Sequence, residues 1–191
     1  PLGGKNMEKI RPYQEKDFDR VRKICLENAG DTRTEEQKIF ILSTYCDYYI
    51  EQEPENCFVA VNENDEAVGY IFCAENFDIF KDRFKEIYLP RVKALGSDKW
   101  KDSLESYQLH EKYKGIYPAH LHLDVDAAYQ RRGLGGRLSD SLIDHLRTKG
   151  IGGLMFTVGA DNKVGLSFYN KYGFEKIEEG SDDVAMGIKI G

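Results

Sequence analysis

Apolar and polar residues alternate along residues 119–125, just past the middle of the chain. The apolar positions are Ala119, Leu121, Leu123 and Val125, and the polar positions are His120, His122 and Asp124. This period of two predicts a β-strand with two different faces, because successive side chains of a strand point to opposite sides. The polar face needs an explanation, since a buried polar group costs free energy unless it is hydrogen-bonded.

Apolar residues recur every three or four positions in the segments expected to be helical. After the strand, leucines stand at positions 134, 138, 142 and 146, which is typical of a helix that buries one face. Thr34 and Gln37 have the spacing of a capping box at the start of a helix expected to run through residue 50. Two more helices are expected, one from residue 18 and one with Val164, Phe168 and Tyr172 on its apolar face.

Six further strands are expected, at residues 9–13, 57–61, 67–74, 154–158, 174–178 and 184–190. Residues 75–118 separate the third strand from the fourth, and a structureless loop of that length is implausible in a compact domain. The pattern there predicts two helices, one through Phe80, Phe84, Ile87 and Tyr88, the other through Leu104, Tyr107 and His110, with Pro90 and Gly96-Ser97 as breaks. This order predicts an α+β fold around a mixed sheet, with residues 7–191 as one domain and 75–118 as a helical insertion.

Length, charge and composition limit the classes of protein to which the chain can belong. The 191 residues suit one well-buried domain, and a net charge of -6 with a pI near 5.3 argues against a nucleic-acid partner. No apolar run approaches membrane-spanning length and no signal peptide opens the chain, so no membrane partner is expected. Four scattered cysteines predict buried free thiols and a cytoplasmic location. Residues 1–6 look like a cloning scar ahead of Met7, and the oligomeric state stays open.

A glycine-rich loop, from Gln130 to Gly136, leads from the central strand into the leucine-striped helix. Glycines let the main chain approach a ligand closely, and the first N–H groups of a helix lack internal partners. Together these features favour a bound phosphate. A dinucleotide fingerprint would need a third glycine at Leu138, and a P-loop would need Gly-Lys-Ser/Thr at residues 136–138, so the spacing excludes both.

The remaining pattern, Gln-x-x-Gly-x-Gly after a strand ending in valine, resembles motif A of the GNAT acetyltransferase superfamily. Residues 159–174, GADNKVGLSFYNKYGF, are similar to its cofactor-binding loop, helix and following strand. More narrowly, the sequence of these segments resembles the acetyltransferase-like domains related to the one appended to O-GlcNAc hydrolases. The resemblance covers the C-terminal third closely and implies an N-acetyltransferase that moves an acetyl group from acetyl-CoA to an amine by direct attack in a ternary complex.

The resemblance also implies which residues hold acetyl-CoA. The expected cofactor-binding residues are Val125, Gln130, Arg131, Arg132, Gly133, Leu134, Gly135, Gly136 and Asn162. The main chain near Val125 pairs with pantetheine in the family, and the loop amides meet the pyrophosphate, with Arg131 or Arg132 adding charge-assisted contacts. Asn162 also has the sequence context of a helix N-cap, and it can serve both purposes.

Acetyl transfer to an amine needs a base for the amine proton, and the leaving thiolate benefits from an acid. Asp124 or His122, on the polar face of the strand, is the candidate base; the alternative is a satisfied hydrogen-bond ladder or a solvent-facing strand. Tyr169 falls on the position where the family often carries its thiolate-protonating tyrosine, and its alternative role is aromatic packing.

The insertion is expected to form a lid over the acceptor side, with Tyr113 and Tyr117 nearest the acceptor; a dimerisation arm is the competing interpretation. The acceptor itself, whether a small amine, an amino sugar or a protein lysine, does not follow from the fold. Two other functions stay open. One is a catalytically silent acyl-CoA-binding or interaction module, and the other is a metal site at His120-x-His122-x-Asp124, although no metal is expected.

Overall fold

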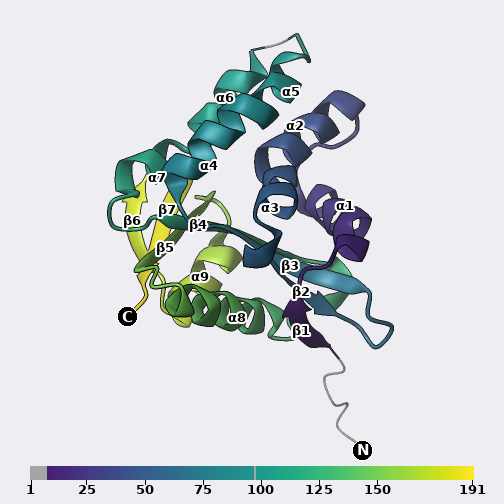
Figure 1. The fold of residues 1–191 in the computed structure, drawn as a ribbon, viewed down its shortest axis with the longest axis vertical. Helices are drawn as coiled ribbons and strands as arrows, with labels where there is room; N and C mark the ends of the chain where they lie inside the picture. The colour runs from purple at the N-terminus through teal and green to yellow at the C-terminus, as the bar shows by residue number, and fades with distance from the viewer. Residues whose placement is uncertain (1–7, 97) are drawn as a thin grey trace, which may run out of the picture. The chain divides into compact units, whose positions relative to one another are not determined.

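Seven strands form one mixed sheet in the computed structural model, which describes residues 8–96 and 98–191 (Figure 1). They are β1 (Lys9–Pro12), β2 (Phe58–Val61), β3 (Ala67–Ala74), β4 (Ala119–Val125), β5 (Gly153–Gly159), β6 (Glu175–Glu179) and β7 (Asp183–Lys189). Their order across the sheet is β1-β2-β3-β4-β5-β7-β6. β4 and β5 are parallel, whereas β1–β2, β2–β3, β5–β7 and β6–β7 pair antiparallel, which confirms the expected α+β fold.

The chain divides into two compact units. Unit 1 contains Pro1–Cys73 and His122–Leu142, and unit 2 contains Ala74–Leu121 and Ile143–Gly191. The boundary between them therefore falls inside β4, whose first half belongs to unit 2 and whose second half belongs to unit 1. The expected cloning scar, the domain start at Met7 and the break at Ser97 lie outside the described residues.

Unit 1 places three helices between its first two strands. They are α1 (Phe18–Asn28), α2 (Glu35–Tyr45) and α3 (Asp47–Gln52), with the short helical turns η1 (Glu15–Asp17) and η2 (Pro54–Asn56); a further turn, η4 (Ala127–Tyr129), follows β4. The capping box at the start of α2 is confirmed: the Gln37 amide donates to Thr34 Oγ1 (3.1 Å) and the Thr34 amide donates to Gln37 Oε1 (2.9 Å).

The single helix expected through residue 50 is wrong, because the chain breaks between α2 and α3. Cys46 has φ -128° and ψ -64°, outside the helical region. Directly after the break, Asp47 pairs with Arg22 of α1 at 2.9 Å. The apolar spacing continues across the break, since Leu42 and Tyr49 are both buried, so the pattern could not reveal it.

The insertion between β3 and β4 is helical, but it contains more elements than the two expected helices. Its elements are α4 (Phe77–Arg83), the π-helical turn η3 (Phe84–Tyr88), α5 (Leu89–Lys93), α6 (Lys99–Glu105) and α7 (Gln108–Tyr113). Pro90 does not end the first run, because it lies in the first turn of α5, where a missing N–H costs little. The second expected helix divides around Ser106 and Tyr107.

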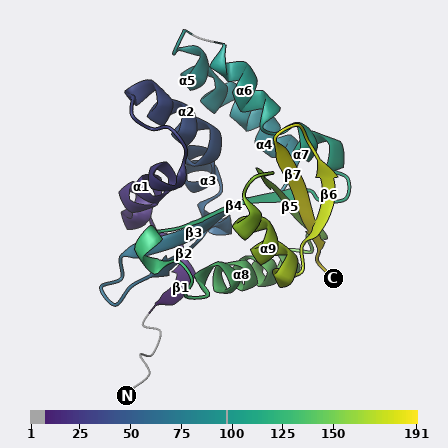
Figure 2. The same ribbon diagram turned by 180° about the vertical axis from the view of Figure 1, so that it is seen from behind.

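In unit 2, helices cover both faces of β5. Met155 of β5 lies in a cluster with Tyr117 and Ala185, against which Leu109 and Tyr113 pack. The next residue, Phe156, packs against Tyr169 of α9 (Lys163–Tyr172), with ring centroids 4.1 Å apart. Because neighbouring residues of a strand point to opposite faces, α7 and α9 cover opposite sides (Figure 2).

The buried face of α9 differs from the expected one. Val164 is 78% exposed, whereas Tyr169 is only 8% exposed, because its ring packs against β5. Asn162 does cap this helix, with Oδ1 accepting a hydrogen bond from the Gly165 amide at 2.9 Å. Gly173 ends it with φ +124°, a backbone conformation that favours glycine.

The leucine-striped helix is α8 (Leu134–Thr148), and all four of its expected core leucines are buried. All four cysteines lie among the described residues; they are buried and form no disulfide, as expected. Burial and a hydrogen bond with Cys25 raise the pKa of Cys46. No helix among the described residues is long and apolar enough to cross a bilayer.

Candidate active site

The second half of β4 holds two polar side chains within unit 1, His122 and Asp124. The hydroxyl of Tyr70, on β3, donates to Asp124 Oδ2 at 2.5 Å. The hydroxyl of Tyr49, on α3, shares a hydrogen bond of 2.9 Å with His122 Nε2. Both polar side chains in this half of the strand therefore have a tyrosine hydroxyl as a hydrogen-bond partner.

Stacked aromatic rings fix the positions of these two hydroxyls. The rings of Tyr70 and Phe72 stack at 3.8 Å, as expected for residues two apart on one face of β3. Phe72 also stacks with Tyr49 at 5.9 Å. All three rings have no exposed surface, so they form a rigid wall behind His122 and Asp124.

The environment shifts the two pKa values in opposite directions. Burial raises the pKa of Asp124 to about 7, and the hydrogen bond from Tyr70 acts against that rise. Burial lowers the pKa of His122 to about 4. A base works best when its pKa is near the operating pH, so Asp124 is the better base of the two at neutral pH. Sequence reasoning could not decide between them.

His120 lies in a different environment, within unit 2. It is 1% exposed, and its ring packs against Phe80 (4.6 Å), His110 (4.9 Å) and Tyr107 (5.5 Å). The polar face expected for the whole strand therefore lies in two environments: His120 packs among aromatic rings, whereas His122 and Asp124 have hydroxyl groups as partners. Across the described residues, no group of three or more His, Cys, Asp or Glu side chains is arranged to hold a metal ion.

The glycine-rich loop adopts a backbone that only a few residue types tolerate. Gly133 has φ +79° and Arg131 has φ +62°, both in the left-handed region. The loop then enters α8 at Leu134, and Gly136 has no neighbouring atom within 4 Å of a Cβ built on it. The amides of this first turn lack internal acceptors and carry the positive end of the helix dipole, which suits an anion.

Two expected cofactor-binding residues also have partners within the chain. Gln130 Nε2 donates to the Val125 carbonyl at 3.0 Å, so this side chain ties the loop to the end of β4. Asn28 donates to the same carbonyl at 3.4 Å. The direct contacts of Val125 and Gln130 with a cofactor stay predictions.

The structure separates the two loop arginines, which the sequence left as alternatives. Arg132 pairs with the buried Glu8 at 2.7 Å, and its guanidinium lies 4.9 Å from the Tyr129 ring centroid. Arg131 is exposed and has no ion-pair partner among the described residues. Arg131 is therefore the arginine available to an anionic ligand.

The expected acid, Tyr169, belongs to unit 2. Besides Phe156, its ring contacts Phe174 at 5.6 Å and Phe168 at 5.0 Å. Packing is thus one function of this side chain, and its role as a proton donor stays a prediction.

The two tyrosines expected to touch the acceptor also have structural contacts in unit 2. The Tyr113 hydroxyl donates to Glu178 Oε2 at 2.6 Å, and this hydrogen bond raises the pKa of Tyr113. Tyr117 is 9% exposed and packs against Met155 and Ala185. Their contact with an acceptor, and the lid role of the insertion, stay predictions.

Sequence reasoning missed Tyr70, the partner of Asp124. It precedes Asp124 by 54 residues, and the pairing register of the two strands cannot be read from their composition. Tyr49 stood out only as one member of a tyrosine-rich helix.

Residues 20–174 match the family model described as the acetyltransferase (GNAT) family. The chain belongs to this family. Over 52 residues it is 42% identical to the [ribosomal protein bS18]-alanine N-acetyltransferase of Salmonella typhimurium, a match that spans 27% of this chain and 35% of that relative.

Solved structures share the fold over nearly the whole chain. The crystal structure of SsHAT matches with a TM-score of 0.83 and 24% identity, covering 96% of this chain and 98% of the other. The PaiA N-acetyltransferase of Thermoplasma acidophilum, in complex with coenzyme A, matches with a TM-score of 0.60 and 18% identity over 95% and 98% of the two chains.

Proposed function

We propose that this protein is an N-acetyltransferase that moves the acetyl group of acetyl-CoA to an amine. The observation that carries the proposal is Asp124, a carboxyl group whose pKa lies near 7, in the same unit as the glycine-rich loop at the start of α8. A base poised at neutral pH and a site for a pyrophosphate are the two things this reaction requires. Membership of the acetyltransferase family supports the same conclusion.

The loop fits the pyrophosphate of acetyl-CoA. The left-handed backbone at Arg131 and Gly133 turns the chain into α8, and the open space at Gly136 allows close approach. Leu134, Gly135 and Gly136 offer first-turn amides, and Arg131 adds a positive charge. Acetyl-CoA, when bound, supplies the thioester; the CoA complex of the PaiA relative supports this ligand.

Asp124 accepts the proton of the attacking amine, while Tyr70 holds the carboxylate in place. The amine nitrogen forms a bond to the acetyl carbon as the carbon–sulfur bond breaks, with no covalent enzyme intermediate. Tyr169 then donates a proton to the departing sulfur. His122, with its lowered pKa, stays neutral and orients the site through Tyr49.

The proposed acceptor is an amine. The name of one relative, the [ribosomal protein bS18]-alanine N-acetyltransferase, supports this class of acceptor. We further propose a relationship to the acetyltransferase-like domains related to the one appended to O-GlcNAc hydrolases, because the sequences of residues 119–135 and 159–174 resemble them. Small amines, amino sugars and protein lysines are the acceptor classes to screen.

The test is release of free CoA from acetyl-CoA across an acceptor panel, combined with thermal unfolding in CoA. At ligand near 100 times its dissociation constant, binding stabilises the fold by about 2.7 kcal/mol. Gly135→Val blocks close approach of the pyrophosphate and removes this shift. The matched control is Gly30→Val, at an exposed glycine of unit 1 with open space around it.

The outcomes separate the rival functions. A melting temperature indifferent to CoA contradicts the proposal. CoA binding without turnover of any acceptor favours a silent acyl-CoA-binding module. If an acceptor is found, Tyr169→Phe keeps the ring and CoA affinity while turnover falls on the order of 10²-fold, as expected for loss of a general acid.

A further inference from the structure

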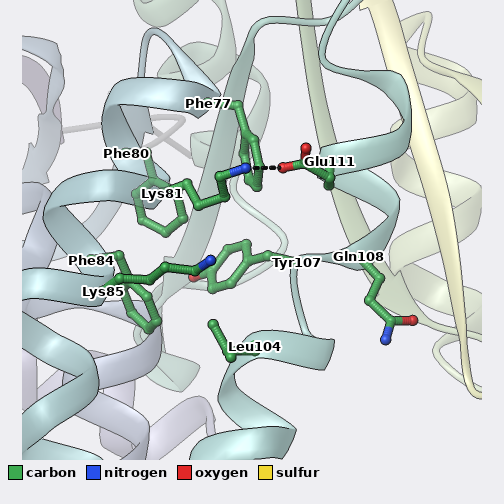
Figure 3. Close-up of a pocket in the computed structure, with 9 residues that line it drawn as sticks. All are labelled: Phe77, Phe80, Lys81, Phe84, Lys85, Leu104, Tyr107, Gln108 and Glu111. Carbon is green, nitrogen blue, oxygen red and sulfur yellow. Dashed lines mark hydrogen bonds and ion pairs between the residues drawn. The ribbon is translucent and has the colours of Figure 1, made fainter.

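A separate pocket opens inside the helical insertion, entirely within unit 2 (Figure 3). Its volume is about 300 Å³. Its lining residues come from α4, η3, α6 and the segment around α7, and they are Phe77, Phe80, Lys81, Phe84, Lys85, Leu104, Tyr107, Gln108 and Glu111. None of them belongs to the proposed acetyl-transfer machinery, so the pocket is available for another ligand.

Aromatic rings form the interior of this pocket. Phe80, Phe84 and Tyr107 are each at most 5% exposed, and the Tyr107 centroid lies 4.8 Å from that of Phe80 and 5.7 Å from that of Phe84. Flat apolar groups pack favourably against such rings. The volume is roughly twice that of an engineered cavity that holds benzene, which suits a ligand of one or two rings.

The rim of the pocket is positively charged. Lys81 and Lys85 extend from α4 and η3 in the direction of α7 (Figure 3). Lys81 pairs with Glu111 at 3.0 Å, whereas Lys85 is exposed and has no ion pair with any residue that the structure describes. Two lysines and one carboxylate leave one positive charge uncompensated, which favours a ligand with a single negative charge.

We propose that this pocket binds a small aromatic monocarboxylate. The ring of the ligand packs against the edges of Phe80 and Tyr107 that line the cavity, and its carboxylate pairs with Lys85. The ring wall of the pocket also packs against His120, at the start of β4. The inference is independent of acetyl transfer, because none of these residues contacts acetyl-CoA or the amine in the proposed mechanism.

The test is calorimetric titration of the whole protein with phenylacetate, 3-phenylpropionate and indole-3-acetate. Phenylacetamide removes the charge, and acetate removes the ring. At least one aromatic acid should bind more tightly than both controls. Three results would overturn the proposal. Phenylacetamide could bind as tightly as phenylacetate, or acetate could bind as tightly as the aromatic acids. The third is that no acid binds at about 10 mM, roughly the weakest affinity at which such a site would be useful.

Two variants locate the binding to this pocket. Leu104→Trp fills the cavity from a half-buried position and should abolish binding, while Lys85→Met should weaken it about 5-fold, as expected for a solvent-accessible ion pair. The control is Arg83→Met, an exposed cation of α4 outside the lining, which should bind as the parent does. Unchanged affinity in both pocket variants overturns the assignment, provided that circular dichroism shows them folded.

Should Leu104→Trp fail to fold, the smaller Leu104→Phe takes its place. CoA-dependent thermal shifts are recorded for every variant. Loss of aromatic-acid binding with the CoA shift intact supports a separate site, whereas parallel loss of both overturns it.

Discussion

The two halves of β4 present the same alternation of residues but have different chemistry. In the first half, His120 is buried among the aromatic rings of the insertion. In the second half, His122 and Asp124 have tyrosine hydroxyls as partners, and their pKa values shift in opposite directions. A polar residue on a strand therefore gains a chemical role from what packs against it, and the alternation alone does not distinguish a packed histidine from a base.

The largest effect is expected from Asp124→Asn, which keeps the shape of the side chain and removes its basicity. Turnover should fall by about 10²-fold or more, the usual contribution of a general base. In the parent, kcat/KM should rise with pH through a pKa near 7, because only the ionised carboxylate accepts a proton. The variant should lose this acidic limb. Full activity with a good acceptor would show that another group is the base.

The second prediction concerns stability and separates His122 from Asp124. Between about pH 4 and 7 the folded state keeps Asp124 protonated while the unfolded state ionises it, so stability falls as pH rises. Between about pH 4 and 6.5 the folded state keeps His122 neutral while the unfolded state protonates it, so stability rises with pH. The two contributions oppose each other in the parent protein.

Single variants should expose each contribution. Asp124→Asn should be more stable than the parent at pH 7.5 by about 2–4 kcal/mol, because it removes a carboxyl group whose pKa is raised to about 7. The variant keeps the contribution of His122, so it should lose stability as pH falls from 6.5 to 4. His122→Phe should instead gain stability over the same fall. Urea unfolding at several pH values measures both slopes. Parallel pH profiles for the two variants would contradict the assigned pKa shifts.

Local signals in the sequence were sufficient to predict much of the fold and the turn of the glycine-rich loop into a helix. Three features each depend on residues within a few positions of one another: the capping box at Thr34, the helix start within the Gln130–Gly136 segment and the N-cap at Asn162. The leucine stripe of α8 predicted its buried face correctly for the same reason. Such features survive folding because tertiary contacts reinforce them.

The features that sequence reasoning missed depend on contacts between distant residues. Arg22 pairs with Asp47 where α2 and α3 separate, and Arg132 pairs with Glu8 across 124 positions. Tyr70 reaches Asp124 only because β3 and β4 are neighbours in the sheet with a particular register. The pairing register of strands and the geometry of ion pairs depend on the packed chain. The sequence therefore could not show which of Asp124 and His122 is the better candidate base, nor which loop arginine lacks an ion pair.

A smaller effect is expected from Tyr70→Phe, which removes the hydroxyl and keeps the stacked ring. The hydrogen bond from Tyr70 lowers the pKa of Asp124, so its loss should raise that pKa further. The acidic limb of kcat/KM should move to higher pH, and activity at pH 7 should fall up to about 10-fold, since one pKa unit is a factor of ten in the ionised fraction. Activity at pH 9 should recover most of the loss. An unshifted limb would mean that Tyr70 does not act on the base.

The smallest effect is expected from His120→Phe. An aromatic ring of similar size can occupy the space beside Phe80 and Tyr107, so the free energy of unfolding should change by less than about 1.5 kcal/mol. Turnover should stay within about 2-fold of the parent value, because His120 has no part in the proposed proton transfer and a 2-fold change is below 0.5 kcal/mol in barrier height. Urea unfolding and kcat at pH 7.5 measure both quantities. A loss of turnover near that of Asp124→Asn, in a variant that unfolds like the parent, would show that the first half of β4 is reactive too and that the contrast between its halves is wrong.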